Sequence, residues 1–409
     1  MKVLFVCHRV PFPPQRGGKI RPFNIVKHLS ERGHEVTVAS LARTERERDE
    51  AGGLAQHCAK TLVDVIPDYI AWPRMVARLA SSQPSSFGYF HSRHLARQIA
   101  AELAREDYEL IFVHCSSMAP YVATHEAPLK VLDYGDMDSQ KWLEYAQHRP
   151  FPLSTGYWLE GRKLQRTERR LAEHFDLCTC TTQAELQSLR QLGVNSPADW
   201  FPNGVNSDYF RPATDGYDAN VVVFVGRMDY YPNQQAVTKF CTEVLPGLSA
   251  QRPEVRFEIV GANPPAHIRA LARIRGVSVT GTVPDVRPYV TRAALSVAPL
   301  EIARGTQNKI LESMAMGVPV VCSPQAAGGV NAVPGEHLLT AHDSQEYIAA
   351  ILGILQSAPR RQALATAARA RVMSSHTWAY SMSRLDELLS RAQRRSPESR
   401  VADAPRVAI

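Results

Sequence analysis

Short apolar runs alternate with amphipathic segments along most of this chain. The run Lys2–Cys7 is apolar after its first residue, and Lys19–Arg32 then carries apolar residues at helical spacing before Gly33. The next apolar run is Glu35–Leu41. Continuous apolar runs are typical of strands buried on both faces of a parallel sheet. The order of strand, loop, helix and strand therefore predicts a Rossmann-like α/β fold.

The same alternation continues to the end of the chain and restarts after a polar segment at 211–219. At 409 residues the chain is too long for one hydrophobic core, so we expect two domains. We place an N-terminal Rossmann-like domain at 1–200 and a second one at 201–376. A last amphipathic helix over 378–393 is expected to return to the first domain, and 394–409 is polar and expected to be disordered.

The clearest strand–helix–strand unit lies between residues 294 and 322. An apolar run over 294–300 is followed by Gly305, which opens a loop, and by Thr306, which we expect to cap a helix. Apolar residues then recur at helical spacing until Gly317, and 318–322 is the next strand. The helix N-terminus would face the carboxyl end of the sheet, where backbone N–H groups and the helix dipole favour a phosphate.

Two charged side chains share one face of this helix. Lys309 and Glu312 are three positions apart, which places them side by side. A cation beside a carboxylate suits a ligand that carries both phosphates and a ribose diol. The unit therefore predicts a nucleotide site.

Other candidate residues lie where predicted strands end. Gly17 and Gly18 follow the first strand and either let a ligand approach the backbone or form a simple turn. His114 ends a strand at the edge where ligands bind in such sheets. Arg227 follows another strand, and its guanidinium is either a bidentate phosphate ligand or a partner in a surface salt bridge.

The sequence carries no pattern that indicates a metal or disulfide framework. The seven cysteines are scattered and odd in number, which favours buried thiols in a reducing compartment. Asp136 and Asp138 form an Asp-x-Asp pair, but they lie far from the phosphate-type unit, so we interpret them as a loop and helix cap. We therefore expect no metal.

Charge and hydropathy limit the remaining classes. The net charge of +7 permits an anionic partner, but Lys and Arg are spread along the chain without an aromatic-basic motif, which argues against nucleic acid. The basic-aromatic segment 67–94 is expected to be irregular and is either a membrane-surface or acceptor site or packs on its own domain. A basic helix over 154–174 is interpreted as a solvated face. No apolar run approaches 18 residues, and the N-terminus is too short for a signal-peptide core, so we expect a cytoplasmic protein with peripheral contact to the anionic inner membrane as an open alternative.

Four motifs in order resemble the retaining glycosyltransferases of the GT-B fold, family 4. The resemblance spans residues 1–393. It is carried by the motifs Gly17-Gly18, Asn203-Gly204-Val205, Val225-Gly226-Arg227 and Lys309–Val321. The chain also resembles, more loosely, the group associated with exosortase-type exopolysaccharide clusters. The family fold implies two Rossmann-like domains, with parallel sheets and helices on both faces, that face each other across a cleft. The second domain would bind a nucleotide sugar and the first a glycan or lipid-linked acceptor.

The resemblance also implies roles for the candidate residues. Glu312 would bind the ribose hydroxyls, Arg227 the diphosphate, and the 17–18 loop the β-phosphate and sugar, with His114 near the reaction centre. Gly305, Thr306 and Asn308 belong to the donor loop. The chain departs from the family pattern at Arg304, where a sugar-binding glutamate is usual, and at 231–233, where a lysine is usual.

The implied reaction is transfer of a sugar from a nucleoside diphosphate sugar to a hydroxyl, with retention and without a metal or other cofactor. Arg227, Lys309 and the helix N-terminus would stabilise the departing diphosphate. A UDP-sugar epimerase of the same architecture and a non-catalytic nucleotide-sugar-binding protein remain as alternatives.

Overall fold

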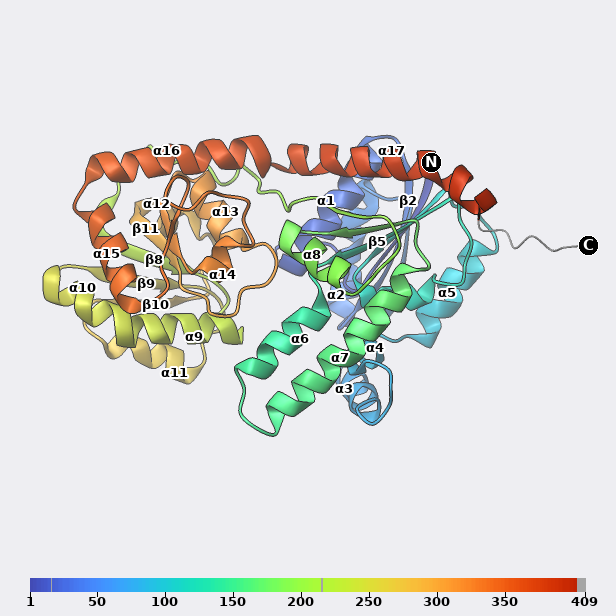
Figure 1. The fold of residues 1–409 in the computed structure, drawn as a ribbon, viewed down its shortest axis with the longest axis horizontal. Coiled ribbons are helices and arrows are strands. Elements are labelled where there is room, and N and C mark those ends of the chain that lie inside the picture. Colours follow the sequence, from blue (N-terminus) through green and yellow to red (C-terminus); the bar gives the residue numbers. More distant parts are fainter. Residues whose placement is uncertain (16, 215, 403–409) are drawn as a thin grey trace, which may run out of the picture. The chain divides into compact units, whose positions relative to one another are not determined.

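The computed structural model describes residues 1–15, 17–214 and 216–402, and the chain divides into two compact units. The first unit comprises Met1–Phe201 together with the last helix from Met382 onward, and the second comprises Pro202–Ser381 (Figure 1). Each unit contains one parallel sheet covered by helices. The expected fold class, two Rossmann-like α/β domains, is confirmed.

The first unit has a seven-stranded sheet in the order β3-β2-β1-β4-β5-β6-β7, and every pair in it is parallel. Its central strands are buried, which matches the apolar runs in the sequence. The strands are β1 Lys2–Cys7, β2 Glu35–Ala42, β3 Lys60–Val65, β4 Leu110–His114, β5 Leu129–Gly135, β6 Leu177–Cys180 and β7 Ala198–Trp200.

Helices of the first unit follow the strands and fill the crossovers. They are α1 Gly17–Glu31, α2 Glu45–Glu50, α3 Asp68–Ala77, α4 Ser85–Tyr89, α5 Arg93–Leu103, α6 Asp138–Gln147, α7 Leu153–Ala172 and α8 Gln183–Gln191, with short 3₁₀ turns at Ala51–Gln56 and Ser116–Tyr121. The core is formed by apolar residues of the strands and of the inward helix faces, among them Leu4, Ile99 and Leu164.

The second unit has a six-stranded parallel sheet in the order β10-β9-β8-β11-β12-β13. Its core is continuous from β8 and β11 to the helices on either side. The strands are β8 Asp218–Val225, β9 Arg256–Val260, β10 Val277–Gly281, β11 Ala293–Ala298, β12 Val320–Cys322 and β13 Leu339–Thr340.

Eight α-helices of the described residues lie between these strands or follow them before the chain returns to the first unit. They are α9 Tyr231–Lys239, α10 Leu245–Gln251, α11 Ala266–Arg269, α12 Arg287–Arg292, α13 Asn308–Ala315, α14 Pro324–Ala327, α15 Ser344–Leu355 and α16 Ala358–Ser375, of which α11 is a single turn. A π-helical turn over Phe240–Val244 joins α9 to α10, and a 3₁₀ turn at Ala270–Arg273 follows α11.

The last helix, α17, spans Trp378–Ala402, whereas we expected it to end near Gln393. The predicted disorder therefore differs from the structure over 394–402, and its remainder, 403–409, lies outside the described residues. Within the first unit, Asp386 of α17 accepts a hydrogen bond from His28 Nε2 at 2.9 Å, and Leu385 is fully buried. These contacts fix the last helix to α1.

Two further predictions need correction. The segment 67–94 was expected to be irregular, but it contains α3 and α4. Gly17 and Gly18 were expected in a loop, but they are the first two residues of α1. Glycine has a low helix propensity, which disfavours a helix start at these two positions. The helix still forms because Ile25, Val26 and Leu29 are buried, and this packing outweighs the low propensity of the glycines.

Strand order marks one place in each sheet where ligands bind. In the first unit the order reverses between β1 and β4, and in the second it reverses between β8 and β11. At such a switch point the flanking loops leave in opposite directions and open a crevice at the carboxyl ends of the strands. The residues that follow these four strands are therefore the candidates for chemistry.

Glycines hold the loops of the second unit close together at this edge. A Cβ atom on Gly329 would lie 1.9 Å from the Gly305 carbonyl oxygen, and one on Gly261 would lie 1.7 Å from that of Gly226. Backbone contacts this close exclude any side chain. The loops after β8 and β9 are thus packed backbone to backbone, and so are the loop after β11 and the segment after α14.

We expect Gly329→Ala to destabilise the second unit by about 2 kcal/mol or more, because the added methyl group overlaps the backbone of the Gly305 loop. Urea unfolding measures the loss. Gly328→Ala is the matched control, since its Cβ would meet only atoms at 3.5 Å and beyond. Equal stability of the two variants would contradict the close packing.

Candidate functional site

At the switch point of the second unit, a lysine from α13 reaches the first turn of α9, the helix that follows β8. Lys309 Nζ donates a hydrogen bond to Asn233 Oδ1 at 2.6 Å, and it lies 4.6 Å from the centre of the Phe224 ring. Asn233 is buried, and its Nδ2 donates to the Arg227 carbonyl oxygen at 2.8 Å. One amide therefore connects the loop backbone after β8 to the lysine of the neighbouring helix.

The partner of this lysine is neutral, and that affects its protonation. Withdrawal from solvent lowers the pKa of Lys309 to about 7, and the neighbouring Glu312 opposes this shift only in part. An ammonium group in this position gains from any anion that approaches it. Lys309 was predicted as a phosphate ligand, and its geometry is suited to that role.

Glu312 lies one helical turn further along α13. Withdrawal from solvent raises the pKa of its carboxyl group to about 7, with Lys309 acting in the opposite direction. Among the residues that the structure describes, none donates a hydrogen bond to this carboxylate. A half-buried carboxylate of this kind can accept hydrogen bonds from a pair of hydroxyl groups.

Arg227 is paired with an acid that the sequence analysis did not identify. Its Nε donates to Asp229 Oδ1 at 3.0 Å, and its Nη2 contacts Asp229 Oδ2. The Arg227 side chain is 42% exposed and the Asp229 side chain is 40% exposed. Asn263 Nδ2 also donates to Asp229, at 3.3 Å. The guanidinium is thus oriented by a carboxylate and keeps an edge open to solvent.

The loop before α13 differs from our expectation at its end. Thr306 does not cap the helix: Gln307 occupies the N-cap position without a side-chain cap bond, and its Nε2 donates to the Arg304 carbonyl oxygen at 3.1 Å. The helix begins later because Gly305 takes a positive φ of 63° that turns the loop first. Asn308 begins the helix, and its buried Oδ1 has no hydrogen-bond partner among the described residues.

At the switch point of the first unit, two histidines lie next to each other. His8 follows β1 and His114 ends β4, and their ring centroids are 5.8 Å apart. Burial and the neighbouring His114 hold the pKa of His8 well below its ordinary value, so this ring is neutral. Its Nδ1 is buried without a hydrogen-bond partner within the described part of the chain.

His114 is held by a fully buried ion network. Its Nδ1 lies 2.7 Å from Asp133 Oδ2, and Arg21 donates to both oxygens of this carboxylate at 2.9 Å. Thr179 Oγ1 donates to Asp133 Oδ1, also at 2.9 Å. Despite complete burial, Arg21 and His114 hold the pKa of Asp133 below its ordinary value of 3.8. The ionised carboxylate fixes the hydrogen on Nδ1, which directs Nε2 of His114 away from the network.

The remaining predicted residues fall into two groups. Gly17 and Gly18 are exposed at the start of α1, and a Cβ on Gly18 would lie 4.0 Å from His8 Nε2, so this helix start belongs to the histidine site. Asp136 and Asp138 are not helix caps, because Met137 holds the N-cap position of α6. Asp136 accepts a hydrogen bond from Thr181 at 2.5 Å, and Asp138 lies 3.8 Å from Cys115 Sγ.

Several important residues carried a signal that the sequence analysis did not use. His8 directly follows its strand and His114 ends its own, and the parallel pairing of β1 and β4 brings the two residues together. Asp229 lies two positions from Arg227, a common spacing for a turn pair. Arg21 and Asn233 had no such signal, because each acts across more than 70 residues of sequence, on Asp133 and Lys309.

Comparison with known proteins agrees with this architecture. The fold alone defines a protein with two Rossmann-like domains. Residues 16–209 match the family described as Glycosyltransferase Family 4, and residues 219–357 match Glycosyl transferases group 1. The two domains together make the chain a glycosyltransferase of the GT-B type.

Individual relatives are distant. A GDP-mannose-dependent monoacylated alpha-(1-6)-phosphatidylinositol monomannoside mannosyltransferase from Corynebacterium glutamicum is 21% identical over 350 residues, which cover 76% of this chain and 91% of that protein. A sucrose-phosphate synthase from Thermosynechococcus elongatus superposes with a TM-score of 0.71 at 18% identity, over 96% of this chain and 99% of that one. HepE from Anabaena in complex with UDP gives 0.69 at 18% identity, over 95% and 100%.

The buried network of Asp133, Arg21 and His114 is expected to stabilise the first unit. We expect Asp133→Asn to destabilise the first unit by about 3 kcal/mol, because it leaves Arg21 buried without a counter-charge. The lowered pKa of Asp133 contributes stability above the pKa of the unfolded chain, near 4, and this contribution is lost as pH falls below it. Urea unfolding between pH 3 and pH 7 measures both effects.

The surface pair Lys27–Glu31 provides the control for this prediction. Its groups are 43% and 60% exposed, so Glu31→Gln should change stability by less than about 0.5 kcal/mol. The acid-dependent part of the stability should be smaller in Asp133→Asn than in wild type. A variant as stable as Glu31→Gln would show that the network contributes nothing.

Proposed function

We propose that this protein transfers a sugar from a nucleoside diphosphate sugar to a hydroxyl group of an acceptor, with retention of the anomeric configuration. One observation carries the proposal. A lysine, an arginine and a carboxylate with no hydrogen-bond donor from the described residues meet at the switch point of the second unit. This set matches the diphosphate and ribose of one ligand.

In this proposal the second unit holds the donor. Glu312 accepts hydrogen bonds from the two ribose hydroxyls, and Lys309 with Arg227 binds the diphosphate. The first N–H groups of α13 add a further set of donors, since they have no partner within the helix. Asn308 Oδ1, buried without a partner among the described residues, is available to a hydroxyl of the ligand.

The chemical demand of the reaction is the departure of the diphosphate. As the sugar–oxygen bond breaks, negative charge gathers on the phosphate and positive charge on the sugar. Lys309 and Arg227 are already oriented by Asn233 and Asp229, so little reorganisation accompanies this charge separation. The acceptor hydroxyl then attacks on the face that the diphosphate leaves, and its proton passes to the leaving phosphate.

The first unit supplies a histidine for the sugar and acceptor. Asp133 and Arg21 fix the ring of His114, which leaves Nε2 to donate or accept a hydrogen bond at a sugar hydroxyl. His8 is neutral and adjacent, so it adds no competing charge. We place the acceptor, a glycan, a polysaccharide or a lipid-linked sugar, on this unit and assign the product to exopolysaccharide or cell-surface glycan synthesis.

Related proteins support a nucleotide sugar without agreeing on its base. HepE has been crystallised with UDP and with UDP-glucose, whereas the related mannosyltransferase is described as GDP-mannose-dependent. In this chain Arg304 stands where we expect a residue that contacts the sugar. A cation at that position favours a donor with an anionic or strongly hydrogen-bond-accepting sugar.

A thermal-shift screen of UDP-, GDP- and dTDP-sugars tests the proposal, because a ligand that binds only the folded state raises its melting temperature. We expect one nucleotide class to raise it, and the same nucleotide sugar to release nucleoside diphosphate in the presence of acceptor glycan. Epimerisation of the sugar without acceptor, or binding without any turnover on a panel of acceptors, would contradict the assignment.

We expect Glu312→Gln and Arg227→Ala to lower turnover by about 100-fold or more while the protein stays folded, because each removes a contact to the departing nucleotide. Initial rates of nucleotide release measure the effect, and circular dichroism confirms the fold. Arg256→Ala is the control, since this arginine lies on the same sheet and pairs with Asp218 at the other end of β8. Rates near wild type in both site variants would exclude these roles.

The low pKa of Lys309 predicts proton uptake when the diphosphate binds. At pH 8 the amine is mostly neutral, because its pKa is about 7, and a bound diphosphate raises that pKa again. Calorimetric titrations in two buffers of different ionisation enthalpy should therefore show net uptake of up to about one proton. Affinity should fall as pH rises above 7.

The variant Lys309→Arg separates this effect from other groups. Arginine stays protonated in proteins, so the variant should bind without proton uptake at pH 8. Glu312 is mostly ionised at that pH and ribose hydroxyls favour its ionised form, so it takes up no proton. Wild-type binding at pH 8 without uptake would contradict the role of Lys309.

A further inference from the structure

Helix α3 presents its apolar side to solvent. Tyr69, Trp72 and Val76 recur along it at helical spacing, and Leu79 continues this stripe in the turn after the helix ends at Ala77. Tyr69 is 77% exposed and Trp72 is 53% exposed, whereas Ala71 is the buried residue of this helix. An amphipathic helix normally turns the apolar stripe to its own core. The sequence alone left this segment undecided between a surface site and internal packing, and the exposure decides against packing of this stripe.

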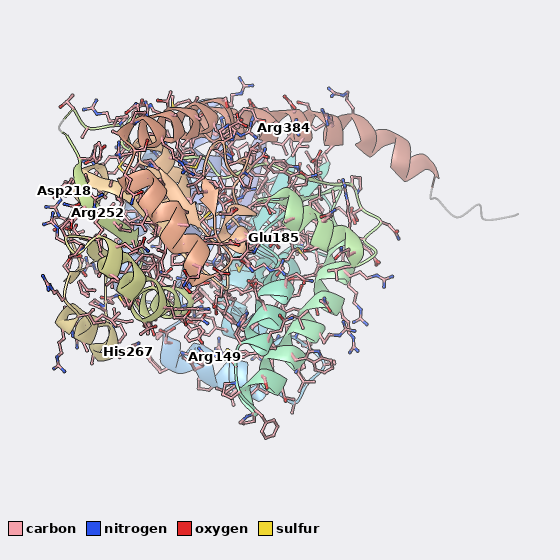
Figure 2. All side chains as sticks on the ribbon, turned by 60° about the vertical axis from the view of Figure 1, so that its left-hand side comes forward. Arg149, Glu185, Asp218, Arg252, His267 and Arg384 are labelled. Carbon is pink, nitrogen blue, oxygen red and sulfur yellow. The ribbon has the colours of Figure 1, made fainter. Side chains whose placement is uncertain are left out.

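A second set of exposed apolar residues lies on the hairpin of α6 and α7. Phe151, in the turn between the two helices, is 82% exposed, and Leu153, Trp158 and Leu159 follow on the first turns of α7. Figures 1 and 2 show α3 and this turn, marked by Arg149 in Figure 2, at the same end of the first unit. Lys163 Nζ of α7 donates to the Leu79 carbonyl oxygen at 2.7 Å, which joins the two sets.

We define the α3–α7 face by these eight residues: Tyr69, Trp72, Val76, Leu79, Phe151, Leu153, Trp158 and Leu159. A hollow of about 480 Å³ between α6 and α7 adjoins it. Its lining includes the aromatic ring of Trp158, the cation of Arg162 and the apolar side chain of Leu143. Eight large apolar side chains at one end of a unit exceed the scattered exposure that a soluble surface normally carries.

Most of the exposed charges beside the face are positive. In α7 every exposed charged residue is an arginine, at positions 162, 166, 169 and 170, because both acids of this helix, Glu160 and Glu168, are buried. The Ser86 backbone N–H donates to Glu160 at 3.0 Å, and that of Ser139 donates to Glu168 at 3.1 Å. In α3, Arg74 and the one acid, Asp68, are both exposed, and Asp68 accepts a hydrogen bond from Tyr89.

From these observations we propose that the α3–α7 face docks on an anionic lipid bilayer. The aromatic and aliphatic tips enter the boundary between headgroups and acyl chains, and the arginines of α7 bind the lipid phosphates. Four of the eight residues are aliphatic. Aliphatic side chains pack favourably against acyl chains, but they form no hydrogen bond or ion pair with the phosphates of a nucleic acid. Among the described residues no helix is long and apolar enough to cross a bilayer, so this contact is peripheral.

The proposal is independent of the donor chemistry, and vesicle binding tests it without any nucleotide. The full chain is sedimented with vesicles of phosphatidylcholine alone and with 30% phosphatidylglycerol. We expect binding to the anionic vesicles only, with an affinity that falls as salt rises. Replacing Trp72, Phe151 and Trp158 together by Ser should weaken binding by roughly 100-fold, since each exposed aromatic residue contributes at the interface.

Matched controls separate this face from general hydrophobicity and charge. Replacement of Ile274, Val333 and Met373 by Ser removes three exposed apolar residues of the second unit and should leave binding unchanged. Arg166→Gln with Arg170→Gln should weaken binding by roughly 25-fold, at about fivefold for each cation near an anionic surface. Arg273→Gln with Arg275→Gln removes two exposed arginines elsewhere and should have no effect.

Circular dichroism and size exclusion are recorded for every variant. The proposal is supported if binding of the protein to anionic vesicles is lost only in the variants of the α3–α7 face. Equal binding to both vesicle types, no binding by wild type, or full binding by the triple variant would each overturn it. A wild-type dimer that the triple variant converts to a monomer, without vesicle binding in either, would assign the face to a second copy of the chain and overturn the bilayer.

Discussion

A charge at the carboxyl edge of a parallel sheet must find a partner, because the strands behind it exclude water. Both switch points of this protein depend on that constraint. Asp133 is fully buried and ionised only because Arg21, His114 and Thr179 surround it. Lys309 meets the same demand with a neutral amide, Asn233. The first arrangement fixes a ring in one orientation, whereas the second leaves a cation ready for an anion.

The apolar pattern predicted the fold class and most strands, since continuous runs such as Ile111–Val113 can be buried only inside a parallel sheet. It placed helix starts less well. Thr306 has the right side chain for a cap, but the positive φ of Gly305 and the backbone contact at Gly329 turn the chain first. A cap preference of about 1 kcal/mol does not outweigh such packing.

The candidate site was predicted only where the signal is local. Lys309 and Glu312 share one helix turn, so their spacing was enough. Asn233 and Arg21 act on residues 76 and 112 positions away, and no local pattern reports such contacts. The outward stripe of α3 was similarly hidden, because its periodicity is the same whether the apolar side faces the core or the solvent.

Asn233 also determines how the lysine behaves when no ligand is bound. A carboxylate at this position would form a permanent ion pair with Lys309 and compete with every incoming phosphate. The amide accepts one hydrogen bond from Nζ and carries no charge, so it holds the amine in position without neutralising it. A bound diphosphate therefore completes the electrostatic balance at this edge of the sheet, because it raises the pKa of Lys309 and holds the amine in its charged form.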